Sequence, residues 1–169
     1  GYQSVEGYGI KERIGLGGIF KHNVGDLRTY SLNFSTFYAD TGGLSDSLFF
    51  ERGHNSKEDS GVANTEDLSS YAFSFSGSYN QNFTYRLGFA DQAAGISDAT
   101  DNTRYSASMM YKHKISDDLG TKFIFERMHI DNLAGEDAHN RSHTTGGLEF
   151  DFNKWNFGTT YTFTDNDAD

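Results

Sequence analysis

The chain of 169 residues contains no cysteine and no proline. Without cysteine, neither disulfide bonds nor a thiolate metal site can hold the fold together. Without proline, every residue keeps its backbone N–H donor, which suits strands that hydrogen-bond along their whole length. No apolar run approaches the roughly 18 residues that a transmembrane helix requires. These absences favour an all-β protein.

Charge and length narrow the class of protein further. The formal net charge of −10 argues against nucleic acid as a partner. The mean hydropathy of −0.65 is low for a membrane protein, but only every second residue of a barrel strand meets lipid. The length suits a single domain over residues 1–169, either a β-barrel or a barrel segment with about eight strands.

The clearest pattern lies in residues 69–91, where large aromatic residues alternate with small polar ones. Phe73 and Phe75 share one parity, and Ser74 and Ser76 share the other, which is the period-two pattern of a strand. After a polar turn the alternation is repeated. A soluble β-sandwich would place long charged side chains on its polar face, whereas the concave lumen of a barrel favours serine, threonine and glycine.

Two tyrosines bracket the first of these strands. Tyr71 and Tyr79 are separated by about 26 Å at about 3.3 Å per residue. This spacing is close to the apolar band of roughly 25 Å between the aromatic girdles of outer-membrane barrels. The sequence therefore favours a transmembrane barrel over the alternative, a soluble all-β domain.

The same alternation recurs in eight segments, which are joined alternately by short turns and long loops. The predicted strands cover residues 10–21, 27–39, 69–79, 83–91, 104–115, 121–130, 147–153 and 155–164. The predicted long loops cover residues 40–68, 92–103 and 132–144. In the first loop, the apolar residues 44–52 predict a strand extension or a small hairpin, with a plug folded into the lumen as the alternative.

Short turns on one side and long loops on the other are typical of bacterial outer-membrane barrels. In this pattern nearly the whole chain resembles outer-membrane β-barrel proteins of the porin type, without a family-specific motif. The resemblance implies an antiparallel up-and-down transmembrane β-barrel in the bacterial outer membrane. It also implies a channel for passive diffusion of small polar or charged solutes, with no cofactor and no catalysis. The implied partners are outer-membrane lipid, lipopolysaccharide and the solutes, and a homo-oligomer is compatible.

Charged residues at inward positions predict the lining of a pore, because a charge inside a barrel needs water or a partner. Basic residues dominate the early strands and acidic residues the late ones, so a basic wall would face an acidic wall. The predicted pore-lining residues are Lys11, Arg13, Arg86, Lys112, Lys122, Glu126, Glu149 and Asp151. The alternative is a closed structural or adhesin-type barrel, in which interior charges pair with one another and acidic extracellular loops bind a partner.

Outward residues near strand ends are predicted to lie at the lipid interface, where aromatic rings and cations meet head groups. These residues are Tyr71, Tyr79, Tyr111, Arg127, Trp155 and Tyr161.

The histidines suggest no site of their own. His139 and His143 fall in a predicted loop, so solvated side chains are favoured over a metal site. His113 and His129 face outward, but the neighbouring outward positions offer no serine nucleophile. The sequence therefore predicts neither a metal site nor an enzyme.

The direction of the strands gives a last expectation. If the short turns are periplasmic, both chain ends fall on the long-loop side, whereas bacterial barrels normally begin and end in the periplasm. An open sheet of eight strands would leave two unpaired edges in lipid, which a bilayer does not permit. The sequence therefore predicts a segment of a larger barrel, with at least about ten and plausibly about sixteen strands.

Overall fold

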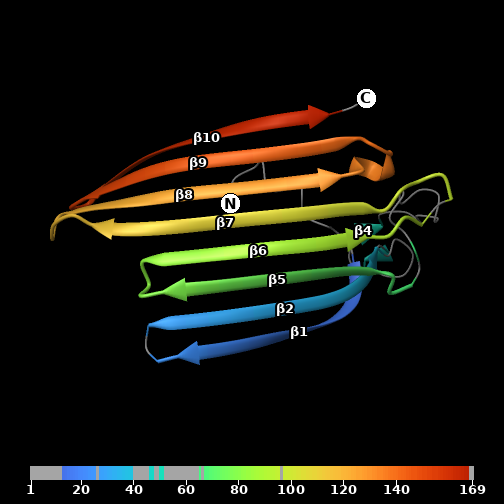
Figure 1. Cartoon of the computed structure of the whole chain (residues 1–169), viewed down its shortest axis with the longest axis horizontal. Coiled ribbons are helices and arrows are strands. Elements are labelled where there is room, and N and C mark those ends of the chain that lie inside the picture. The colour runs from blue at the N-terminus through green and yellow to red at the C-terminus, as the bar shows by residue number, and fades with distance from the viewer. Residues whose placement is uncertain are drawn as a thin grey trace.

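The computed structural model describes residues 13–25, 27–39, 46–47, 50–51, 65, 67–95 and 97–167. For Arg13, Ile14, Ala39 and residues 46–51 it describes the backbone alone. Eight long strands form one antiparallel sheet in sequence order, as Figure 1 shows. These strands are β1 (Arg13–Val24), β2 (Arg28–Ala39), β5 (Ser70–Tyr79), β6 (Phe83–Gln92), β7 (Asn102–Lys114), β8 (Leu119–Asp131), β9 (Asn140–Phe152) and β10 (Trp155–Asp167).

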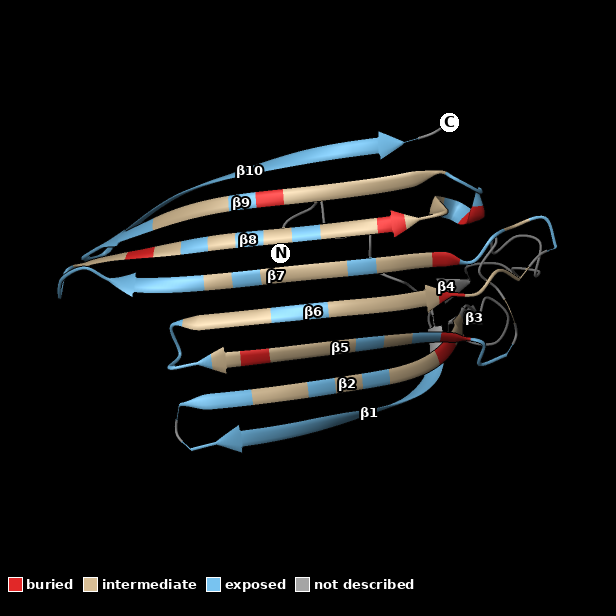
Figure 2. Ribbon diagram, viewed as in Figure 1, coloured by how far each residue is buried: buried red, intermediate tan, exposed pale blue. Residues whose placement is uncertain are grey.

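This architecture confirms the predicted all-β, up-and-down arrangement of eight strands. The sheet is not closed into a barrel: among the described strands, β1 and β10 form its two edges and do not pair with each other. Figure 2 shows both edge strands as exposed, while the central strands are more covered. The open sheet agrees with the expectation that the first and last strands do not pair, and the transmembrane barrel stays a prediction.

A small hairpin lies in the longest connection, between β2 and β5. It consists of β3 (Asp46–Ser47) and β4 (Phe50–Glu51), which pair only with each other among the described strands. This confirms the small hairpin predicted within residues 44–52. The first predicted strand began at residue 10, and its first three residues lie outside the described part of the chain.

The prediction for residues 132–144 is wrong in its second half, because β9 begins at Asn140 rather than at residue 147. Residues 140–145 contain no apolar side chain, so the sequence has no period-two hydrophobic signal there. The backbone nevertheless pairs on both sides. Ser142 lies opposite His129 of β8 and opposite Asp165 of β10. Backbone hydrogen bonds to β8 and β10 therefore extend β9 beyond the residues in which hydrophobic alternation is visible.

The short turns stand at one end of the sheet, the turn end, and the long connections at the other, the loop end (Figure 1). Between β5 and β6, Asn80 and Gln81 have φ angles of 49° and 55°, and the N–H of Asn82 donates to the Tyr79 carbonyl oxygen over 3.2 Å. Positive φ at both central positions is what a tight hairpin turn of type I′ requires. The predicted short turn at residues 80–82 is confirmed.

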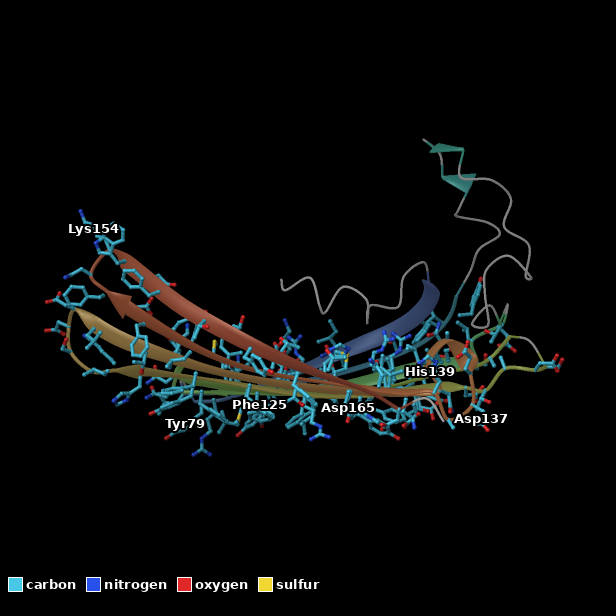
Figure 3. All side chains as sticks on the ribbon, turned by 90° about the horizontal axis from the view of Figure 1, so that it is seen from above. Tyr79, Phe125, Asp137, His139, Lys154 and Asp165 are labelled. Carbon is cyan, nitrogen blue, oxygen red and sulfur yellow. The ribbon has the colours of Figure 1, made fainter. Side chains whose placement is uncertain are left out.

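Strand pairing without bulges gives the sheet two chemically distinct faces. The registers place the predicted outward residues on one face; for example, Phe34 lies opposite Phe73, which lies opposite Phe89. Figure 3 shows that the sheet is curved, with Tyr79 on its convex side. We call this the convex face and the other the concave face. Among the described strands, every exposed large hydrophobic residue except Ile19 lies on the convex face.

The described residues bury little hydrophobic surface. Their buried hydrophobic side chains are Phe37 and Ile130, each 1% exposed, and both lie on the concave face towards the loop end. A soluble domain normally covers its apolar sheet face with a second layer, but the described residues place no such layer on the convex face. In the same residues, no helix is long and apolar enough to cross a membrane.

A glycine interrupts the aromatic convex face in β5. Gly77 lies opposite Tyr85 of β6, and a Cβ atom at Gly77 would lie 2.6 Å from the Tyr85 hydroxyl oxygen. The Tyr85 ring also contacts Phe75, with 5.8 Å between the ring centroids. Because Gly77 has no side chain, the Tyr85 ring can lie over the β5 backbone. A cross-strand aromatic ring in this position stabilises a glycine in a sheet.

Candidate functional site

The concave face is hollowed where the central strands lie side by side. Ser74 of β5 faces Gly88 of β6, and Ser76 faces Arg86 in the next row of the same strands. Because most of these side chains are short, two open hollows of about 780 and 500 Å³ lie over them. The sequence thus builds a shallow polar trough on the side of the sheet opposite the aromatic rings.

Arg86 lines both hollows, and its side chain is exposed. In the described part of the chain, no ion pair or hydrogen bond engages its guanidinium. Ser108 of β7 separates Arg86 from Glu126 of β8 in the register. The two charges therefore stand two strands apart, about 10 Å at about 4.8 Å per strand. A solute in the trough would meet both.

A second charged group lies nearer the turn end. Lys112, Lys122 and Glu149 are neighbours across β7, β8 and β9. Lys122 and Glu149 form an ion pair with side chains that are 25% and 17% exposed. Lys112 is exposed beside this pair. The Lys122 charge is therefore neutralised locally, whereas the Lys112 charge remains directed to the trough.

The predicted pore-lining residues fall on this face wherever their side chains are described. They are Arg86, Lys112, Lys122, Glu126, Glu149 and Asp151. Lys11 lies outside the described residues, and Arg13 is described only as backbone in β1. Basic and acidic residues lie side by side on the one concave face of this open sheet. A basic wall that faces an acidic wall across a lumen therefore stays a prediction.

Two arginines on the concave face were not among the predicted lining residues. Arg104 of β7 donates hydrogen bonds to Asn102 Oδ1 over 2.7 Å and to Gln92 Oε1 over 3.3 Å. Arg141 of β9 donates from Nε to Asn166 Oδ1 over 2.6 Å. The parity of its strand would have placed Arg104 correctly. Arg141 was missed because its segment was read as a loop.

The predicted lipid-interface residues all lie on the convex face. They are Tyr71, Tyr79, Tyr111, Arg127, Trp155 and Tyr161. Arg28 joins them at the turn end, where its guanidinium lies 5.2 Å from the centre of the Tyr79 ring. An arginine stacked on a tyrosine combines a cation with an apolar ring.

The histidines of the HNRSH segment have separate partners. His139 Nδ1 lies 2.9 Å from a carboxylate oxygen of Glu136, and His143 Nδ1 lies 2.8 Å from the Thr164 hydroxyl. No group of three or more potential metal ligands gathers in the part of the chain that the structure describes.

A hydrogen-bonded trio lies on the convex face at the loop end. His129 Nδ1 lies 2.7 Å from the Ser142 hydroxyl oxygen, and His129 Nε2 lies 2.7 Å from Asp131 Oδ1. The expectation that no serine lies near the outward His129 is therefore wrong. It failed because β9 begins seven residues before its predicted start, at Asn140 rather than 147, and so carries Ser142 to the position opposite His129.

Comparison of the chain with known protein families, curated proteins and solved structures finds no match. The two faces of the sheet, and the groups that each face presents, are therefore the features that indicate a function.

Proposed function

We propose that this sheet is part of the wall of a porin-type β-barrel in the bacterial outer membrane, with lipid on its convex face and water on its concave face. Further strands that pair with the edge strands β1 and β10 would complete the barrel. A barrel of about sixteen strands leaves an aqueous channel. The channel passes small polar or charged solutes by diffusion.

The chemical difference between the two faces carries this proposal. On the convex face, neighbouring rings contact one another across strands, as Phe89 and Tyr105 do with 5.3 Å between centroids. Many rings of this face are exposed among the described residues, such as Phe73, Tyr105 and Phe157, and an extended exposed apolar surface marks contact with a membrane or a partner. Lipid is the partner that covers an aromatic sheet face along its whole length.

The loop and turn ends of this face would then lie near lipid head groups. Tyr71 and Tyr79 stand at opposite ends of β5 on the convex face. The exposed cations Arg28 and Arg127 lie on the same face. Arginine side chains pair well with phosphate groups, so lipopolysaccharide and phospholipid phosphates are the ligands proposed for them.

The concave face supports passage of polar solutes, with a preference for anions. Its small side chains leave the two open hollows, and basic side chains outnumber acidic ones on the described strands. The basic residues are Lys21, Arg86, Arg104, Lys112, Lys114, Lys122 and Arg141, and the acidic ones are Glu126, Glu149 and Asp151. Charged side chains along a pore select permeant ions of the opposite sign.

Conductance across planar bilayers tests this proposal. The double variant Arg86→Glu/Lys112→Glu should shift the reversal potential in a salt gradient toward cation selectivity, because both side chains are exposed on the concave face. The matched control is Arg28→Glu/Arg127→Glu, which makes the same change in net charge on the convex face. Its reversal potential should stay close to that of the wild-type protein. An equal shift in both variants would contradict the assignment of the faces.

The second candidate is a closed barrel with a structural or adhesive role. The Lys122–Glu149 ion pair favours it, since pairing of interior charges is what a closed lumen needs. The same bilayer measurement separates the candidates. A folded, inserted protein without conductance would rule out the pore and leave the closed barrel.

A further inference from the structure

The trio of Ser142, His129 and Asp131 has the contacts of a nucleophile, a base and an orienting acid. A carboxylate accepts hydrogen bonds, so Asp131 fixes the proton of neutral His129 on Nε2. His129 Nδ1 is then the acceptor, and the Ser142 hydroxyl donates to it. Each contact is 2.7 Å long, within the range expected for a serine activated by a histidine.

We propose that this trio is a hydrolytic site for carboxylic esters of long acyl chains. Ser142 is the catalytic nucleophile, His129 the catalytic base, and Asp131 a positioning residue that holds the imidazole. The same three roles act on unrelated folds, where Nε2 of the histidine faces the serine and Nδ1 faces the acid. Here the ring nitrogens are exchanged, with Nδ1 facing Ser142 and Nε2 facing Asp131.

The surroundings of the trio suit a substrate that is part apolar and part polar. The His129 ring lies 6.4 Å from the Tyr105 ring, which lies 5.3 Å from the Phe89 ring, measured between centroids. Both aromatic residues belong to the convex face, so an acyl chain could lie along them. The side chains of His129 and Asp131 are each 35% exposed, which leaves the site open to an approaching ester.

Two charged side chains outside the trio, Arg127 and Asp165, lie beside it on the convex face. Arg127 precedes His129 by two residues on the same face of β8, and no ion pair engages it within the described residues. Its positive charge therefore lies on the face on which an oxygen becomes negative during acyl transfer. Asp131 and, from β10, Asp165 opposite Ser142 carry negative charge.

The reaction follows from these roles. The Ser142 oxygen attacks the ester carbonyl carbon while its proton passes to His129 Nδ1. The carbon–oxygen bond to the alcohol then breaks, and His129 returns the proton to the leaving alkoxide. Water, deprotonated by His129, attacks the acyl-serine, releases the carboxylic acid and restores Ser142. No oxidant or metal takes part in this balance.

The choice of a membrane lipid as the natural ester rests on the proposed function, because that function puts the convex face in the bilayer. The trio itself does not depend on a pore. Hydrolysis of an ester in detergent and conductance in bilayers can therefore fail independently.

The folded full chain should be tested in detergent micelles with a fluorophosphonate probe and with p-nitrophenyl octanoate. The wild-type protein should be labelled and should release p-nitrophenolate. Ser142→Ala should abolish labelling and lower kcat on the order of 1,000-fold or more. Ser116→Ala is the matched control, at an exposed serine in the turn between β7 and β8, and it should change neither readout.

Asp131→Asn separates positioning from folding. It should lower kcat at least ~100-fold with little change in KM, because the imidazole loses its orienting carboxylate and not its substrate contacts. Sheet content by circular dichroism should match that of the wild-type protein. Absence of labelling in the folded wild type, or equal labelling of Ser142→Ala, would overturn the hydrolytic site. Cleavage of the soluble ester without release of fatty acid from phosphatidylethanolamine vesicles would overturn lipid as the substrate.

Discussion

The convex and concave faces share one backbone and differ in what alternate residues place on them. On the convex side of β2, β5 and β6, Tyr30 stacks on Phe75 and Phe75 contacts Tyr85, both diagonally across strands, with centroids 6.2 and 5.8 Å apart. On the opposite side, Ser76 and Ser108 flank Arg86 over an open hollow. Packing on one face is continuous, whereas the other face is left open to a solute.

This difference shows how strictly strand register separates the roles of the two faces. Because the side-chain period is two, a shift of one residue in pairing would move every ring into the trough and every serine to the apolar side. The polar trio at the loop end shares the convex face with charged residues such as Arg127 and Asp165, and it lies where the proposed membrane band gives way to head groups.

The strongest test places one charge on each face of the same strand. Phe75→Arg should destabilise the inserted protein by about 2–4 kcal/mol, the range for a cation facing lipid near the bilayer midplane. Ser76→Arg, the next residue, directs the same group into the trough and should be tolerated. Urea-dependent unfolding from lipid vesicles measures both. Equal losses of stability would show that the two faces do not differ in environment.

A weaker effect is expected inside the concave face. Glu149→Gln leaves the Lys122 ammonium without its carboxylate, and the free energy of unfolding should fall by about 1–2 kcal/mol. The loss is smaller than for a fully buried pair, because both side chains retain some contact with water.

Asp151→Asn provides the control for this pair, since Asp151 is an exposed acid on the same strand and face. It should change stability by less than about 0.5 kcal/mol. Adding Lys122→Met to Glu149→Gln should restore part of the loss. If the double variant is no more stable than Glu149→Gln, the unpaired Lys122 ammonium is not the cause of the lost stability.

The smallest effect compares two glycines of the convex face. Gly77→Ala should cost ~1 kcal/mol, because the new Cβ atom would displace the Tyr85 ring. Gly146→Ala has no atom within 4 Å of the new Cβ position and should be neutral or stabilising by up to about 1 kcal/mol. Equilibrium unfolding of the two variants measures the difference. Stabilisation by Gly77→Ala would mean that the ring does not cover this position.

The strands that were predicted correctly are those in which aromatic and small polar residues alternate. Phe73, Ser74, Phe75 and Ser76 show the period directly, and the register confirms their facing. Arg104 obeys the same parity, so the pattern alone is sufficient to place it on the concave face. Alternation alone therefore recovers the face of a residue wherever a strand has been recognised.

The trio could not be predicted in this way. His129 and Asp131 are two residues apart on one strand, so the sequence shows that they share a face. The position of Ser142 depends on the connection between β8 and β9. Asn132, Ala134 and Ala138 adopt positive φ angles of 53°, 60° and 60° within it. Non-glycine residues seldom adopt such angles. No local sequence pattern predicts the register between β8 and β9 that results from them.

Sequential pairing also makes the hairpin the natural unit by which such a wall can grow in evolution. Each long strand pairs only with the strands before and after it along the described chain. Duplication or loss of one hairpin would preserve the direction, parity and pairing of all the others. The circumference of a barrel built from these strands would then change in steps of two strands, and its diameter would rise roughly in proportion. The pore could therefore become wider or narrower while the residues of the convex and concave faces stay the same.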